Sequence, residues 1–243
     1  MLDRAVDAIG RDIREHGPAA LTVTLGDYID RGPSSRGVLD RLAGNPFPTP
    51  HVALKGNHEA LLESFLADPQ TGPHWRRLGG LETLHSYDVP VRGLLFGKGY
   101  EEAAALLREA MGRHLDFVRS LKTSFSYGKY FLCHAGVRPG IALESQKDED
   151  LLWIRDEFLH SEMDFGKIVV HGHTPVSAPE GAVKPDQYRH RRLCQRAIDV
   201  CGARGRRASL SQNLIKSRAR LSKGDRARPW QFRNLTTAVR GIS

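Results

Sequence analysis

Cysteine is scarce in this chain, and long apolar runs are missing from it. Three cysteines among 243 residues are too few, and too unevenly placed, to form a disulfide framework or a zinc cluster. A reducing compartment is the simplest environment for them. No stretch reaches the ~18 apolar residues that a membrane helix needs, and the first residues lack the basic and then apolar pattern of a signal peptide. We therefore expect a cytoplasmic protein that is not inserted in a membrane.

The remaining composition is typical of a globular protein. Hydrophobic residues make up 40% of the chain and charged residues 26%, which excludes collagen-like and wholly disordered classes. A chain of 243 residues can form one full-sized domain, or a domain with an extension.

Charge is divided unevenly along the sequence. Residues 1–180 hold 20 Lys and Arg against 25 Asp and Glu, a net charge of −5, whereas residues 181–243 hold 16 against 3, a net charge of +13. After residue 180 no sustained hydrophobic period remains. The sequence therefore predicts a folded domain over residues 1–180 and a basic tail, disordered or read out of frame, over residues 181–243.

Helices and strands are expected to alternate within the first region, which is typical of an α/β fold. Hydrophobic spacing predicts helices over residues 2–16, 35–42, 57–67, 101–121 and 150–160, and strands over residues 21–25, 51–54, 129–133 and 167–170. Residues 69–99 are predicted to be mostly irregular. We expect residues 69–128 as a whole to form a helical cap or insertion that controls substrate access.

Polar side chains follow each predicted strand. Residues 26–32, Gly-Asp-Tyr-Ile-Asp-Arg-Gly, follow the first strand, and residues 56–59, Gly-Asn-His-Glu, follow the second. The third strand ends in residues 134–136, His-Ala-Gly, and the fourth in residues 171–174, His-Gly-His-Thr. A surface turn or a packed core histidine would explain any one of these segments, but does not explain four in succession.

The carboxyl ends of strands in open α/β sheets converge on one crevice. Asp27, Asn57, His134 and His173 are therefore expected to meet, although they are far apart in the sequence. Oxygen and imidazole ligands suit Mn, Fe or Zn better than an ion that prefers thiolates. The sequence predicts a metal site at the strand ends.

In this order, the four motifs resemble those of the PPP-type serine/threonine protein phosphatases, in their bacterial form, within the calcineurin-like metallophosphoesterase superfamily. Residues 151–155, Leu-Leu-Trp-Ile-Arg, resemble the family segment that supplies a second phosphate-binding arginine. The resemblance covers about residues 1–180. It implies a four-layer fold of two packed β-sheets flanked by helices, here incomplete at both ends.

The resemblance also implies two divalent metal ions, Mn, Fe or Zn. Asp27 would bridge them, while Asn57, His134 and His173 would complete the ligands of one ion. Such a pair of ions binds phosphate oxygens and directs an activated hydroxide at phosphorus.

Four further residues receive roles from the same resemblance. His58, oriented by Asp30, would be the general acid that protonates the leaving alkoxide. Arg31 and Arg155 would hold the phosphoryl oxygens. Two alternatives remain open: Asp30 and Arg31 could pair with each other, and Arg155 could be an ordinary surface residue of a helix.

The chain departs from the family pattern near its start. The family begins with a strand that leads into Gly-Asp-x-His-Gly, and this sequence does not contain that motif. Its Asp and His would supply most ligands of the first metal, so only one metal site keeps a full ligand set. We therefore expect the chain as written to have greatly reduced phosphatase activity.

A second departure lies after residue 180. When the possible codons of residues 188–206 are read one nucleotide later, they admit a sequence that resembles the last strands of the family. Codon degeneracy permits this without proving it. We hypothesise a frameshift near residues 181–186, which the coding DNA would reveal.

The competing hypothesis is a basic arm that binds nucleic acid without sequence preference, but the tail carries few aromatic residues for stacking.

The favoured function is hydrolysis of a phosphomonoester. The leading substrate is phosphoserine or phosphothreonine in proteins, and small phosphoesters are the other candidate substrates. Symmetrical dinucleoside tetraphosphate hydrolases share much of the motif set, but Asp30 and Glu59 match the protein phosphatases better. The alternative from another class is a non-catalytic remnant or binding module, because the motif for the first metal is missing.

Overall fold

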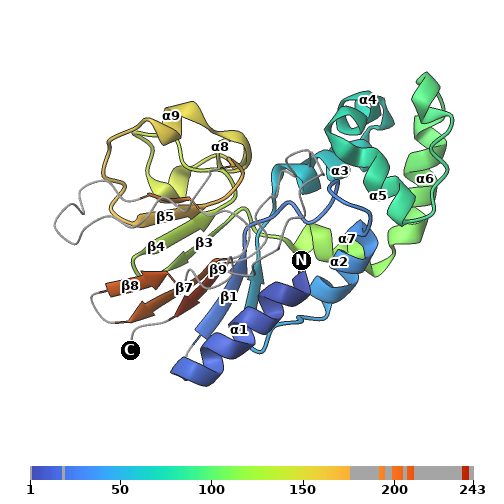
Figure 1. Cartoon of the computed structure of the whole chain (residues 1–243). Coiled ribbons are helices and arrows are strands. Elements are labelled where there is room, and N and C mark those ends of the chain that lie inside the picture. Colours follow the sequence, from blue (N-terminus) through green and yellow to red (C-terminus); the bar gives the residue numbers. More distant parts are fainter. Residues whose placement is uncertain are drawn as a thin grey trace, which may run out of the picture.

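The computed structural model describes residues 2–17, 20–175, 192–194, 199–204, 207–210 and 237–240. These residues form two β-sheets with helices along their outer sides (Figure 1). The predicted α/β architecture of two sheets flanked by helices is therefore confirmed.

The first sheet has the strand order β2-β1-β9-β7-β8. Strands β1 (Ala20–Thr24) and β2 (His51–Ala53) are parallel. β9 (Thr237–Arg240) pairs antiparallel with β1 and parallel with β7 (Asp199–Arg204). β8 (Arg207–Leu210) pairs antiparallel with β7 and ends the sheet.

The second sheet has the order β3-β4-β5-β6. β3 (Ser124–Tyr127) and β4 (Tyr130–Cys133) form an antiparallel hairpin. β5 (Ile168–His171) runs parallel to β4, and β6 (Arg192–Cys194) runs parallel to β5.

Alternating side chains of the strands build the core between the two sheets. Val23 of β1, Leu132 of β4 and Val170 of β5 are fully or almost fully buried there, in one cluster. The intervening residues Phe131 and Val169 point to the other face of the second sheet, since side chains alternate along a strand. Both faces of β4 and β5 are therefore apolar, as expected for central parallel strands covered by helices.

Helices cover the outer faces. α8 (Asp148–Trp153) and α9 (Asp156–Leu159) lie above β5 (Figure 1), where Phe158 packs against the second sheet. α1 (Leu2–His16), α2 (Ser35–Ala43) and α3 (Asn57–Ala67) belong to a separate and larger apolar cluster.

A group of helices from residues 69–120 lies together at one side of the molecule (Figure 1). It contains α4 (Gly72–Trp75), α5 (Leu81–Ser86), α6 (Tyr100–Met111) and α7 (Arg113–Ser120), with short 3₁₀ and π segments between them. The prediction that residues 69–128 control substrate access stays a prediction.

The structure corrects several sequence-based expectations. Residues 69–86 are largely helical rather than irregular, because many short turns follow one another without a long apolar period. The helix expected over residues 101–121 is broken at Gly112, whose φ of 47° and ψ of −123° leave the helical region. The helix expected over residues 150–160 is interrupted at Ile154 and Arg155. β3 was not foreseen.

Predictions for the tail fall mostly on residues that the structure does not describe. The segment proposed for the frameshift, residues 181–186, lies outside the described residues, and so does most of the proposed nucleic-acid-binding arm. Within the described ranges, no helix is both long enough and apolar enough to cross a membrane.

Candidate metal centre

Two glycines bring the loops after β1 and β2 into backbone contact. Gly26 has a φ of +90°, and a Cβ atom on it would lie 2.4 Å from the Gly56 nitrogen. A Cβ on Gly56 would lie 2.4 Å from Asp27 Oδ1. These contacts are too short for any side chain, so both positions require glycine. The close approach sets Asp27 beside the start of α3, where Asn57 and His58 are located.

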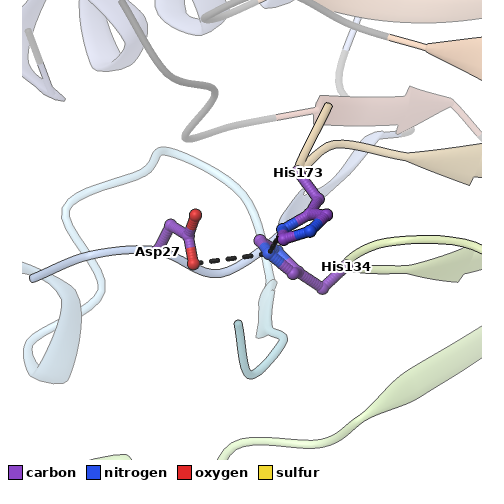
Figure 2. A group of neighbouring side chains, drawn as sticks. All are labelled: Asp27, His134 and His173. Carbon is purple, nitrogen blue, oxygen red and sulfur yellow. Dashed lines mark hydrogen bonds and ion pairs between the residues drawn. The ribbon is translucent and has the colours of Figure 1, made fainter. Parts of the chain in front are cut away.

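Three side chains from other strand ends converge on His134. Its Nε2 atom lies 3.0 Å from Asn57 Oδ1, 3.0 Å from His173 Nδ1 and 3.3 Å from Asp27 Oδ1. Figure 2 shows the Asp27 carboxylate and the His173 ring both next to the His134 ring. All four residues are buried. The structure thus brings together the four residues that the sequence predicted to meet.

Not every close contact between polar atoms in this cluster can be a hydrogen bond, because too few of the atoms carry a proton. His134 Nδ1 lies 2.6 Å from the Leu25 carbonyl and therefore carries the proton that it donates. In the neutral ring, Nε2 then has a lone pair, and Asn57 Oδ1 and Asp27 Oδ1 are acceptors that have no proton to offer it. Lone pairs that face one another in a buried space are stabilised by a cation.

The ligand atoms of Asp27, His134 and His173 all lie within 4.8 Å of one another. With the amide oxygen of Asn57, they form a mixed oxygen and imidazole set that fits Mn, Fe or Zn. The Leu25 carbonyl fixes the tautomer of His134 in the manner that metal-ligating histidines usually show.

Backbone strain is concentrated at this site. Asp27, Asp30 and His173 have φ angles of 59°, 65° and 60°, in the left-handed region that most residues avoid. Such conformations cost about 1–3 kcal/mol each, and they persist only where the surrounding structure enforces them. Strain of this kind is typical of functional sites.

Glu59 is a residue whose role the sequence analysis missed. Its carboxylate accepts hydrogen bonds from the backbone nitrogens of Asp27 at 2.9 Å, Tyr28 at 2.7 Å and Gly56 at 2.8 Å. Burial, and then the nearby charge of Asp27, raise the pKa of Glu59 to about 7. The signal in the sequence was a Glu at the third position of a helix, where it can cap the helix start.

His58 and Asp30 form a buried pair next to the metal ligands. His58 Nδ1 lies 2.8 Å from Asp30 Oδ2, and the His58 backbone nitrogen lies 3.5 Å from Asp27 Oδ1. Burial lowers the pKa of His58, but the hydrogen bond to Asp30 and the charges of Asp27 and Asp30 raise it more, so the net shift is upward. Two other side chains, Trp75 and Thr83, also reach Asp30, and the sequence analysis missed both.

The two arginines differ in their position. Arg155 is exposed, and its Nε donates a hydrogen bond to His173 Nε2 at 3.1 Å, which places it at the edge of the cluster. Arg31 is also exposed, and no hydrogen bond or ion pair joins it to another residue within the described part of the chain. In particular, Arg31 does not pair with Asp30, whose carboxylate binds other groups.

Comparison with known proteins agrees with this geometry. The sequence pattern of the family described as calcineurin-like phosphoesterase matches residues 2–201. A search of curated proteins finds no match. The family match spans most of the sequence and includes every residue of the cluster, so this chain belongs to the calcineurin-like phosphoesterases.

Proposed function

We propose that this phosphoesterase is a phosphomonoesterase of the serine/threonine protein phosphatase type, with phosphoserine and phosphothreonine in proteins as its substrates. The observation that carries the proposal is the buried Asp30–His58 pair beside the cluster of Asp27, Asn57, His134 and His173. This arrangement joins a proton donor to a cation site, which hydrolysis of a phosphomonoester requires.

The cluster would hold a divalent ion through Asp27, Asn57, His134 and His173. A divalent ion bound there would withdraw charge from phosphoryl oxygens and lower the pKa of water. The side chains themselves would position it: His134 is oriented by the Leu25 carbonyl, and Glu59 fixes the loop that carries Asp27.

His58 would donate a proton to the leaving oxygen of the substrate. Asp30 accepts from its Nδ1, so the second ring nitrogen, Nε2, is the atom that offers the proton. The upward shift of the pKa of His58, caused by its hydrogen bond to Asp30 and by nearby carboxylates, favours the protonated form of the ring.

Arg155 and Arg31 would bind the phosphoryl group. Both guanidinium groups are exposed and can approach a substrate from solvent. A planar guanidinium matches two oxygens of a phosphate at once, which a lysine does not.

We further propose that the chain as written holds one ion firmly and works slowly. The described ligands form one group, and the sequence contains no Gly-Asp-x-His-Gly motif for a second. A pair of ions would stabilise both the attacking and the leaving oxygen, whereas one ion alone would not.

The test compares three substrates in the presence of Mn²⁺: a phosphoserine peptide, p-nitrophenyl phosphate and diadenosine tetraphosphate. We expect slow release of phosphate from the first two and no cleavage of the third. His58→Asn should abolish release from the peptide, whereas His160→Asn, at an exposed position, should not. Cleavage of the dinucleotide alone would support the other hydrolase class, and no release from any substrate would favour a non-catalytic binding module.

A further inference from the structure

The Asp30 carboxylate accepts hydrogen bonds from two further side chains besides its contact with His58. Trp75 Nε1 donates to Oδ2 at 2.8 Å, the same oxygen that His58 Nδ1 approaches. Thr83 Oγ1 donates to Oδ1 at 2.6 Å and accepts from the Asp30 backbone nitrogen at 2.9 Å. Each carboxylate oxygen therefore has a donor from outside its own loop.

All the members of this network are buried. The exposed fraction is 2% for Asp30, 1% for His58, 1% for Trp75 and 0% for Thr83. Water therefore does not compete for these hydrogen bonds, and a lost donor would not be replaced by solvent. The geometry of Asp30 depends on protein groups alone.

Trp75 and Thr83 come from the helical group at the side of the molecule, not from the strand ends. Trp75 ends α4, and Thr83 lies in α5, and they stand 45 and 53 residues after Asp30 in the sequence. The segment between them is folded tightly against Asp30. Gly79 has a φ of +113°, and a Cβ on it would lie 2.3 Å from the Asp30 carbonyl oxygen.

Gly80 makes a similar close approach. A Cβ on Gly80 would lie 2.5 Å from Cδ2 of the Trp75 ring. Gly79 thus lets the backbone pass beside Asp30, and Gly80 lets it pass beside the Trp75 ring, while Trp75 and Thr83 bind different oxygens of the Asp30 carboxylate. A carboxylate normally turns with little restriction about its last bond. Donors on both oxygens remove that freedom here.

We propose that Trp75 and Thr83 are positioning residues that fix the Asp30 carboxylate, and through it the ring of His58. This inference rests on the proposed function, in which His58 protonates the leaving group. When one of these two donors is lost, the Asp30 carboxylate can turn away from His58 Nδ1. The His58 ring then loses the partner that sets its orientation and tautomer. Trp75 and Thr83 do not contact the reacting atoms.

The first readout is spectroscopic and needs no activity. In ¹⁵N-labelled protein without added metal, the His58 Nδ1 proton should give a slowly exchanging downfield signal, because it is buried and hydrogen-bonded. Thr83→Val keeps the branched shape of the side chain and removes the hydroxyl that bonds Asp30 Oδ1 and the Asp30 backbone nitrogen. Trp75→Phe keeps an aromatic ring and removes the Nε1 donor, but it also makes the buried side chain smaller. Both should speed exchange of that proton by about tenfold or more. Thr83→Ser restores the hydroxyl and should restore the slow exchange.

The matched control is Thr49→Val. Thr49 is buried, and its hydroxyl lies 2.6 Å from that of Thr22, so the variant also loses a buried hydrogen bond, but remote from Asp30. A thermal melt of each variant separates loss of stability from loss of orientation. Thr49→Val should lower the melting temperature and leave the His58 signal unchanged.

The second readout uses leaving groups. The general acid matters for phenyl phosphate, whose leaving group is poor, and much less for p-nitrophenyl phosphate. We expect Thr83→Val and Trp75→Phe to lower kcat for phenyl phosphate by about tenfold or more, with KM and p-nitrophenyl phosphate turnover changed by less than about threefold.

The outcomes separate the two proposals. Unchanged His58 exchange in both folded variants, or the same acceleration in Thr49→Val, would overturn the positioning role. If Thr83→Val does not fold, Trp75→Phe and Thr83→Ser decide the question. If the unaltered chain releases no phosphate, the proposed function fails, and the exchange measurement still shows whether Trp75 and Thr83 hold the Asp30–His58 pair.

Discussion

His134 is the residue on which the candidate metal centre depends most. Its Nδ1 is bound to the Leu25 carbonyl, and its Nε2 faces oxygen atoms of Asp27 and Asn57. The ring therefore has one nitrogen for orientation and one for a cation.

His134→Ala is predicted to weaken Mn²⁺ binding by at least about 100-fold, because removing a ligand costs more than disturbing the groups that orient one. Equilibrium dialysis or calorimetry would measure the change. His160→Ala removes an exposed histidine and serves as the control. Equal Mn²⁺ affinity in the two variants would show that His134 is not a ligand.

His51 offers a pH prediction that does not involve the metal. It lies on β2, its Nε2 is 3.0 Å from Thr24 Oγ1, and its ring packs on Phe47. Burial lowers the pKa of His51 from 6.5 to about 4. Between these two pH values the unfolded chain binds a proton at this position and the folded chain does not.

The free energy of unfolding should therefore fall as the pH drops from 6.5 towards 4, through the contribution of His51. His51→Gln removes that contribution, so its stability should decline less over the same range. The difference can reach about 3 kcal/mol, since one pKa unit corresponds to ~1.4 kcal/mol. Urea titrations at several pH values would measure it, and parallel curves for the two proteins would contradict the prediction.

Among the secondary-structure elements, the turns that follow β1 and β2 matter most for the site. They bring Asp27 to the start of α3 because Gly26 and Gly56 carry no side chains. Glu59, at the start of α3, then accepts backbone hydrogen bonds from both turns. Two strand ends and one helix start therefore form a single unit.

Gly56→Ala is predicted to separate these turns. Its backbone angles of −101° and 175° suit alanine, so the cost comes from the contact of the new methyl group with Asp27, at 2.4 Å from Oδ1. We expect a loss of about 1–3 kcal/mol in unfolding free energy, as for other overpacked sites, together with weaker Mn²⁺ binding.

Gly10→Ala is the matched control for that variant. Gly10 lies inside α1, and a methyl group there would meet only Arg14 Nη1, at 3.5 Å. Alanine should stabilise the helix by about 0.5–1 kcal/mol. If Gly56→Ala were as stable as Gly10→Ala in a thermal or chemical melt, the close contact of the two turns would be refuted.

Local patterns predicted some elements and missed others for physical reasons. The helix over α1 follows from its apolar spacing and from the Gly17-Pro18 pair that ends it, and helices over α2 and α3 were also predicted from the sequence. The break at Gly112 was missed because a glycine inside a helical pattern costs only about 1 kcal/mol and does not reveal its own φ. The roles of Trp75 and Thr83 were missed because Asp30 is far from both in the sequence.

For the chain as a whole, the two sheets explain how distant residues meet. β1 and β2 belong to one sheet and β4 and β5 to the other, and their strand ends carry Asp27, Asn57, His134 and His173. This convergence could be predicted from the sequence, because strand ends in α/β folds share a crevice. The hydrogen bonds that orient each ligand could not be predicted, because they depend on backbone atoms such as the Leu25 carbonyl.

The central claim is that these four residues surround one cation. A crystal of the protein grown with Mn²⁺ and measured near the manganese absorption edge would test it most directly. We predict an anomalous peak within ~2.0–2.3 Å of Asp27, Asn57, His134 and His173 ligand atoms. The account would be contradicted by a crystal saturated with Mn²⁺ in which all anomalous peaks lie elsewhere and the four side chains make hydrogen bonds only with one another.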